Sequence, residues 1–226
     1  MATKRNTVQD VNLTTSLGGA PAAGDDVLID KWALTYSAGT DLSAVSLNTF
    51  TNQPESRCIF TGPGELTLKL TTGTLTNSGQ GERFDVRSIG ATTVIQTIVL
   101  KPQAATCVQQ LKQLQATTIV CVTGITFLTD TVNVATVNVF GGTLWIHPDN
   151  TGTYPITAAL NVWDGAVTLS RDLPAMTVYG GSVTVNDTAV SPSGTVTVNG
   201  GKLSLQTCGN INQLDANAGT IDMARL

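Results

Sequence analysis

Histidine, charge and aromatic side chains are scarce in this chain of 226 residues. It contains one histidine, His147, and only 12% charged and 5% aromatic residues. No Gly-x-Ser-x-Gly or His-Glu-x-x-His motif accompanies His147, so a catalytic triad or a zinc site would have to be built around this residue alone. We therefore expect no catalytic residue, no metal and no cofactor, and the sequence does not indicate an enzyme.

Basic residues are also few, at 12 against 16 acidic residues, which gives a net charge of −4. Binding to nucleic acid phosphates needs clustered Lys and Arg, and only Lys4 and Arg5 form a cluster, so no nucleic-acid partner is expected. No apolar segment resembles a secretory signal or reaches the length of a membrane span. These absences predict a soluble protein, made in a cytosol, without a membrane partner.

The four cysteines, Cys58, Cys107, Cys121 and Cys208, form no Cys-x-x-Cys pair. Spacing typical of a metal site is missing as well. Free cysteine is one of the most frequently buried residues, so we expect reduced, mostly buried thiols.

One short pattern does recur: two apolar-alternating segments on either side of a glycine turn. The second turn residue of each copy is a glycine, and successive glycines are 23, 16, 20 and 18 residues apart. A period of about 20 residues with one strand-turn-strand unit per period is typical of a stacked solenoid. The five glycines are Gly142, Gly165, Gly181, Gly201 and Gly219.

Alternation within the first copy assigns its side chains to two faces. Val137, Val139, Leu144 and Ile146 share one face, which should point into the coil, and the residues between them should point outward. The change of parity at the turn requires a corner, and glycine provides the positive φ or close backbone approach that a corner needs. The sequence therefore predicts an all-β fold, a single-chain β-solenoid (β-helix) with coils of roughly 20 residues.

The predicted domain organisation is an N-terminal arm or linker over residues 1–23 and a solenoid body over residues 24–226. The arm has little periodicity, whereas the repeats are clearest in residues 137–223. Weaker copies occur at residues 66–75 and 119–125.

Two upstream segments do not follow the pattern clearly. Residues 107–116 have apolar residues spaced by three and suit either a short helix or a strand, with the strand favoured. Residues 78–87 are broken by glycines and charged, and are interpreted as a polar surface loop.

Carboxylates are the other candidates for chemistry, because glycoside hydrolysis on β-solenoids uses paired acids on an outer groove. No pair can be assigned from the sequence, and aspartate is also a common turn residue. A carbohydrate-active site stays one hypothesis among several. Its candidate residues are Asp25, Asp26, Asp30, Asp164, Asp172 and Asp222.

Aromatic residues occupy one equivalent position in three successive repeats. Phe140, Trp163 and Tyr179 share this position, and Asn199 and Asn217 continue it. Alternation places this column on the outside, where stacked coils would align it. An outward apolar stripe suggests contact with a subunit or partner, or a cover supplied by the chain itself, since large exposed apolar patches are rare on monomers.

Several segments resemble β-solenoid proteins of tailed bacteriophages, in particular capsid decoration, or cement, proteins. The resemblance rests on Gly24-Asp25-Asp26-Val27-Leu28-Ile29-Asp30 after a Pro/Ala/Gly-rich lead, on the repeated Val-x-Val-x-Gly-Gly segments, and on Leu169-Ser170-Arg171-Asp172-Leu173 between coils. It covers most of residues 24–226.

The resemblance implies a structural virion protein, often a homotrimer, that sits on the capsid exterior after assembly in the host cytoplasm. Such a protein bridges subunits of the major capsid protein and stabilises the shell through many modest contacts. Lys4 and Arg5 would then help to anchor the arm, and the aromatic column would serve a contact. The alternative is a tail fibre or tailspike component that binds or cleaves host surface glycan.

Overall fold

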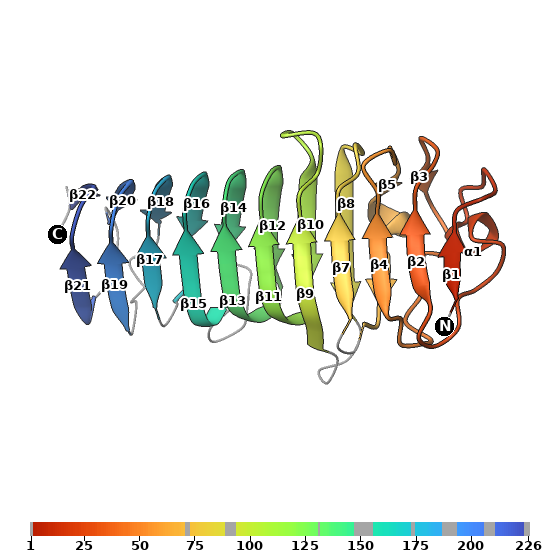
Figure 1. The fold of residues 1–226 in the computed structure, drawn as a ribbon, viewed down its shortest axis with the longest axis horizontal. Helices are drawn as coiled ribbons and strands as arrows, with labels where there is room; N and C mark the ends of the chain where they lie inside the picture. The colour runs from red at the N-terminus through yellow and green to blue at the C-terminus, as the bar shows by residue number, and fades with distance from the viewer. Residues whose placement is uncertain are drawn as a thin grey trace.

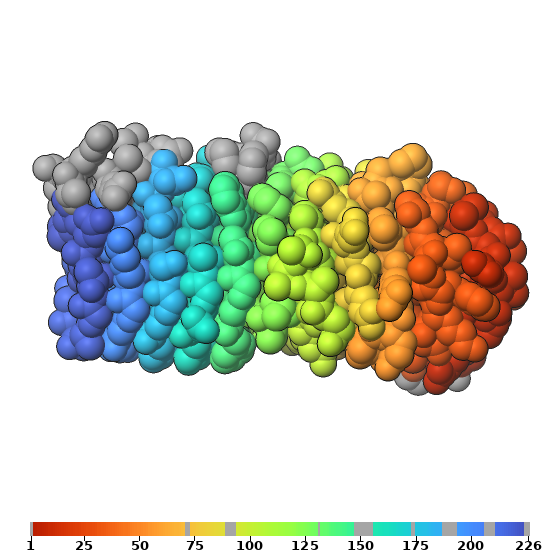
Figure 2. All heavy atoms as spheres, turned by 90° about the horizontal axis from the view of Figure 1, so that it is seen from above, coloured from red at the N-terminus to blue at the C-terminus, as the bar shows by residue number. Residues whose placement is uncertain are grey.

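The protein is a parallel β-solenoid in which the chain coils around a single continuous core (Figure 1). The structure, a computed structural model, describes residues 2–70, 73–88, 94–130, 132–146, 156–172, 175–186, 194–205 and 211–223. Successive coils follow each other along the long axis in chain order, as the bands of Figure 2 show. The predicted all-β solenoid is confirmed.

Two parallel sheets form the walls of the solenoid, and each coil contributes a strand to both. The first sheet contains β1 (Thr3–Arg5), β2 (Asp26–Ile29), β4 (Thr49–Asn52), β7 (Thr74–Asn77), β9 (Val94–Leu100), β11 (Gln115–Cys121), β13 (Asn133–Val139), β15 (Ile156–Val162), β17 (Met176–Val178), β19 (Thr195–Val198) and β21 (Gln213–Ala216). The second contains β3 (Thr35–Tyr36), β5 (Ile59–Phe60), β6 (Leu66–Leu68), β8 (Arg83–Ser88), β10 (Val108–Lys112), β12 (Ile125–Thr129), β14 (Thr143–Ile146), β16 (Ala166–Leu169), β18 (Ser182–Val185), β20 (Lys202–Ser204) and β22 (Thr220–Asp222). Two short helical segments complete the fold, α1 (Leu13–Ser16) and the 3₁₀ turn η1 (Gly62–Gly64).

Strand register reproduces the glycine intervals of the sequence. Thr143 pairs with Ala166, Ala166 with Ser182, Ser182 with Lys202, and Lys202 with Thr220, and each of these residues directly follows a turn glycine. The side chains of Val137, Val139, Leu144 and Ile146 are all buried, as alternation predicts.

Glycine is required at the corner between the two sheets. Gly181 has φ +67°, and a Cβ atom there would lie 2.5 Å from the carbonyl oxygen of Gly165 in the coil before. A side chain at this position would be strained by its own backbone and would also strike the neighbouring coil.

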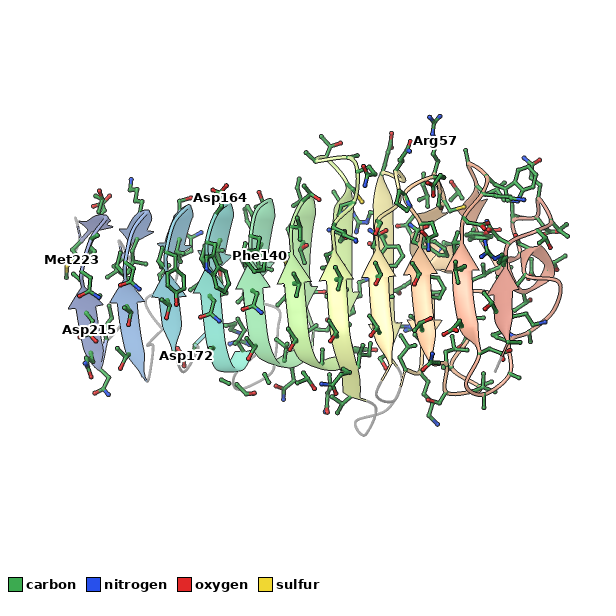
Figure 3. All side chains as sticks on the ribbon, in the orientation of Figure 1. Arg57, Phe140, Asp164, Asp172, Asp215 and Met223 are labelled. Atoms are coloured by element: carbon green, nitrogen blue, oxygen red, sulfur yellow. The ribbon has the colours of Figure 1, made fainter. Side chains whose placement is uncertain are left out.

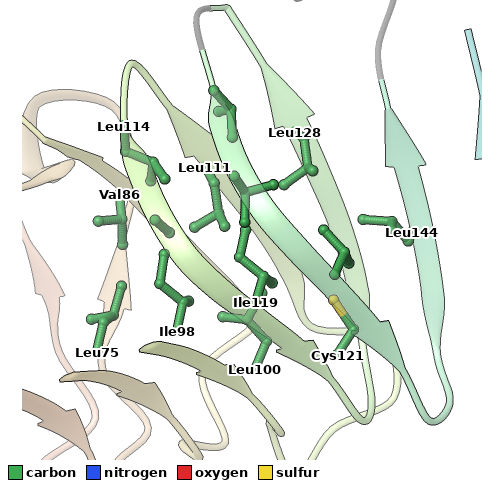
Figure 4. Close-up of a cluster of buried hydrophobic side chains, with 14 of the residues drawn as sticks. Leu75, Val86, Ile98, Leu100, Leu111, Leu114, Ile119, Cys121, Leu128 and Leu144 are labelled. Atoms are coloured by element: carbon green, nitrogen blue, oxygen red, sulfur yellow. The ribbon is translucent and has the colours of Figure 1, made fainter. Parts of the chain in front are cut away.

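The core changes character along the axis. In the N-terminal coils it contains Tyr36, Phe50, Phe60 and Phe84, whose ring centroids lie 5.0 to 6.5 Å apart. In the middle it is aliphatic, with residues such as Leu111 projecting between the sheets (Figure 4). The solenoid narrows toward its C-terminal end (Figure 1).

An internal ladder of polar side chains also crosses the N-terminal and middle coils. The Asn52 amide donates to the Oδ1 atom of Asn77 at 2.8 Å, and the Asn77 amide donates to the Oε1 atom of Gln109 at 2.9 Å. Gln109 in turn donates to the Thr126 hydroxyl at 3.3 Å. Because buried amides need partners, these coils are held in register by hydrogen bonds as well as by apolar packing.

The segment expected to be an N-terminal arm is joined to the solenoid at several points. Thr3–Arg5 forms β1 and pairs with β2, while Leu13 and Leu17 are buried in the core. The Asp25 carboxylate fastens this segment by accepting hydrogen bonds from the backbone N–H groups of Ala2 and Ala22, each at 2.9 Å.

Two upstream predictions need correction, and one open alternative is decided. Residues 83–88 form the strand β8 rather than part of a surface loop, with Phe84 and Val86 buried. The pattern at residues 66–75 does contain two strands, β6 and β7. Here β6 lies in the second sheet and β7 in the first sheet, the reverse of the C-terminal repeats, so this turn lies at a different corner of the coil. Residues 108–112 form the strand β10, as favoured.

Candidate contact surface

The aromatic column predicted from the repeats is a stack of parallel rings. The ring centroids of Phe140 and Trp163 are 4.5 Å apart with 14° between their planes, and those of Trp163 and Tyr179 are 5.2 Å apart with 11° between planes. Each ring follows the last residue of its strand in the first sheet, and Figure 3 shows Phe140 in this position. The three residues are 47%, 37% and 46% exposed, so the described residues around them leave part of each ring open to solvent.

Stacking determines which part of each ring meets solvent. The centroid separations are close to the distance of about 4.8 Å between neighbouring strands, so the rings lie face to face along the solenoid axis. Both faces of Trp163 are therefore occupied by its neighbours, and ring edges point outward. A sugar that stacks on an aromatic side chain needs a free ring face, which Trp163 does not offer.

The column extends beyond the three rings in both directions. Val122, 37% exposed, holds the equivalent position in the coil before Phe140. In the last two coils the position is taken by asparagines, and the Asn217 amide donates to the Oδ1 atom of Asn199 at 2.9 Å. The exposed stripe thus passes from apolar to polar toward the C-terminal end.

A second aromatic pair lies on the outer face of the second sheet. Phe127 and Trp145 are register partners in β12 and β14, and their ring centroids are 5.8 Å apart at an angle of 41°. Alternation predicts an outward Trp145, but alternation alone does not identify Phe127 as its neighbour. Counting 18 residues back from Trp145 would have found it, since that interval also separates Gly142 from Gly124.

The two basic candidates are held in the fold. Arg5 forms an ion pair with Asp30, with 2.7 Å between Nη1 and Oδ2. Lys4 is half-buried and pairs in register with Val27, a core residue, so it occupies a core-side position of the edge strand β1. Arg5 and Asp30 also line a depression of about 350 Å³ with Leu28, Gln53 and Glu55.

The aspartates that were considered for glycoside hydrolysis make hydrogen bonds or ion pairs within the fold, as at Asp25, Asp26, Asp30, Asp164 and Asp222. Asp26 accepts hydrogen bonds from Asn48 and Thr49, each at 2.7 Å, and Asp164 accepts one from the N–H of Gly165. Hydrogen bonds from the backbone of Ala22 and Ala2 lower the pKa of Asp25 below its ordinary value. Asp222 lies 4.0 Å from the Lys202 ammonium.

Thiol burial agrees with the sequence prediction for the described cysteines. Cys58, Cys107 and Cys121 are buried and free, whereas Cys208 lies outside the described residues. Burial raises the pKa of Cys107 to about 11 and that of Cys121 to about 12. These thiols are therefore protonated at neutral pH and poorly placed to act as nucleophiles.

Within the described ranges, no three His, Cys, Asp or Glu side chains are grouped closely enough to hold a metal ion. His147 lies outside these ranges. Among the helices that the structure describes, none has the length and apolar character needed to cross a membrane. Comparison with models of known protein families, with curated proteins and with solved structures found no match.

Proposed function

We propose that this chain is a structural virion protein that decorates a phage capsid and stabilises it by bridging subunits of the major capsid protein. In this proposal it is a homotrimer on the capsid exterior, assembled in the host cytoplasm, and it acts by contact rather than by catalysis. The carrying observation is the exposed stack of Phe140, Trp163 and Tyr179 on a wall of paired strands.

The stack suits a contact surface because it is fixed before any partner arrives. Each ring is held by its neighbours and by the strand beneath it, so binding would cost little side-chain entropy. Exposed aromatic residues that become buried commonly dominate the energy of protein interfaces. Many copies with modest contacts can then hold a shell together through multivalency.

The proposal gives the N-terminal segment a different role from the one first expected. Because β1 is paired and Leu13 and Leu17 are buried, a flexible tether is not available in residues 2–17. Attachment to the shell is therefore assigned to the rigid body, and the aromatic stripe is the first surface to test.

The direct test is co-sedimentation with heads of the encoding phage prepared without this protein. Wild type and Trp163→Phe, which keeps a stacked ring, should bind, whereas Trp163→Glu should lose most binding. Thr168→Glu is the matched control, because Thr168 lies on the outer face of the second sheet in the same coil. Equal binding by all four proteins would refute the role of the stripe.

Failure of wild type to sediment with the heads would refute capsid decoration itself. A binding assay on host envelope glycan then tests the alternative, a tail fibre or tailspike component. Saturable glycan binding together with absent head binding would replace the proposal with that alternative.

A further inference from the structure

The two ends of the solenoid are built differently. At the N-terminal end, α1 and the residues around it lie beyond β1, with Leu13 and Leu17 buried (Figure 1). The edge strand β1 places Lys4 in register with the core residue Val27. An inward-directed charge and a covering segment are two ways in which proteins prevent a sheet edge from pairing with another chain.

The C-terminal end has neither protection among the residues that the structure describes. No described strand pairs with the outer edges of β21 and β22, and Figure 3 places Asp215 and Met223 at this end. Leu214 and Ile221 pack against the core but stay partly exposed, while Val196 and Leu203, their partners in the preceding coil, are fully buried.

Backbone groups at this end are directed away from the solenoid. The carbonyl oxygen of Val198 accepts a hydrogen bond from the N–H of Asn217 in the next coil. Ala216 is the register partner of Val198, so its carbonyl points past the last described coil in the same way. An edge that combines such groups with partly exposed apolar side chains is a template for one more strand.

The side chains of this edge are complementary to themselves. Both edge strands have the order hydrogen-bond donor, apolar residue, aspartate, in Gln213–Leu214–Asp215 and in Thr220–Ile221–Asp222. Within one copy, the Gln213 amide donates to the Asp215 carboxylate of the same strand at 3.1 and 3.2 Å. If two copies meet in an antiparallel arrangement around the central apolar residue, each donor also faces an aspartate of the other copy. A shift that brings Asp215 opposite Asp215 of the second copy would place like charges together, which favours the first register.

We propose that the C-terminal coil docks on the C-terminal coil of a second copy of this chain. The two edges pair in an antiparallel manner with Leu214 at the two-fold axis and Gln213 opposite Asp215 of the second copy. Head-to-tail stacking is disfavoured, because α1 covers the other end and Lys4 would enter the apolar column beside Leu214. The inference goes beyond capsid decoration and does not depend on it.

Opposite charges introduced at Gln213 test this geometry without touching the core, because the side chain is exposed. Cross-strand pairs contribute about 0.2 to 1 kcal/mol each, and the dimer contains two of them, so each change should alter the dissociation constant by roughly 2-fold to 30-fold. Gln213→Lys, facing Asp215 of the second copy, should tighten association, and Gln213→Glu should weaken it.

The measurement is molar mass by sedimentation equilibrium over a range of concentrations. Thr177→Lys and Thr177→Glu are matched controls, since Thr177 lies in the same column as Asp215 but two coils inside the edge. Opposite shifts at residue 213 with none at residue 177 would support the proposal. It is overturned if wild type has the mass of one chain or of three chains at every concentration, or if both variants at residue 213 shift association in the same direction.

Discussion

Replacing Gly181 by alanine separates two reasons for a glycine at the corner. Gly181 and Gly18 have almost the same positive φ, at +67° and +70°. They differ in surroundings: a Cβ at Gly18 would have no atom within 4 Å, whereas one at Gly181 would lie 2.5 Å from the carbonyl oxygen of Gly165. Gly18→Ala is therefore a matched control that changes the φ contribution alone.

The expected losses of unfolding free energy follow from these two contributions. A left-handed conformation costs a residue with a Cβ about 1 to 2 kcal/mol relative to glycine, which is the whole expected effect of Gly18→Ala. At Gly181 the neighbouring coil must also move, and overpacking of this kind adds about 1 to 3 kcal/mol. Gly181→Ala should therefore be the more destabilising change by at least about 1 kcal/mol.

Urea unfolding of both variants measures this difference, read from the midpoints when the slopes agree with wild type. Hydrogen exchange adds a local measurement, because the Ser182 N–H donates to the carbonyl of Gly165 at 2.8 Å. Gly181→Ala should speed exchange at Ser182, and Gly18→Ala should leave it unchanged. Equal losses of stability in the two variants would refute close coil approach as a reason for glycine at the corner.

Three further predictions concern the stack, the thiols and the N-terminal segment. Trp163→Ala removes two ring contacts and should lower the free energy of unfolding by about 1 to 3 kcal/mol. Trp145→Ala removes one tilted ring contact and should lower it by less in the same urea assay. Burial raises the pKa of Cys107 to about 11 and of Cys121 to about 12, so as pH rises these thiols ionise in the unfolded chain before they ionise in the folded protein. The two thiols should therefore not change stability below the ordinary pKa of 9.0, and stability should fall as pH rises above 9.0. Unfolding curves from pH 7 to 10 would show no decline if the thiols were accessible. Asp25 has a lowered pKa, so its contribution to stability is present above the ordinary pKa of 3.8 and is lost as pH falls through the pKa of the folded protein. Asp25→Asn should speed hydrogen exchange in β1 at pH 6, and unchanged exchange would show that this carboxylate does not hold the N-terminal segment in place.

The repeats predicted the C-terminal half in detail because its information is local. Each glycine lies beside the strands that it separates, and alternation from Val137 to Ile146 assigns the inner and outer faces without knowledge of distant residues. Stacking then follows from the period, since one coil can bury its apolar side chains only against the next. The same reasoning brought Phe140, Trp163 and Tyr179 into one column.

The N-terminal half was predicted less well because its elements depend on distant partners. Gly79, Gly81 and the charges from Glu82 onward suggested a loop, yet Arg83 and Asp85 form an ion pair at 2.7 Å on one face of β8 while Phe84 and Val86 enter the core on the other. The segment Thr3–Arg5 carries no strand pattern of its own. It becomes a strand because β2 offers an edge, and a partner of this kind cannot be read from three residues.

The stack also shows why a column of residues does not by itself define a binding chemistry. The strand separation that aligns Phe140, Trp163 and Tyr179 is close to the separation at which rings stack, so the faces of these rings contact one another and their edges face solvent. Ring edges carry partial positive charge and prefer carboxylate or carbonyl oxygens, or the face of another ring. A partner of this stripe is therefore expected to present acidic or aromatic side chains. A partner surface of aliphatic residues alone would bury the stripe but would offer the ring edges neither an oxygen atom nor the face of another ring.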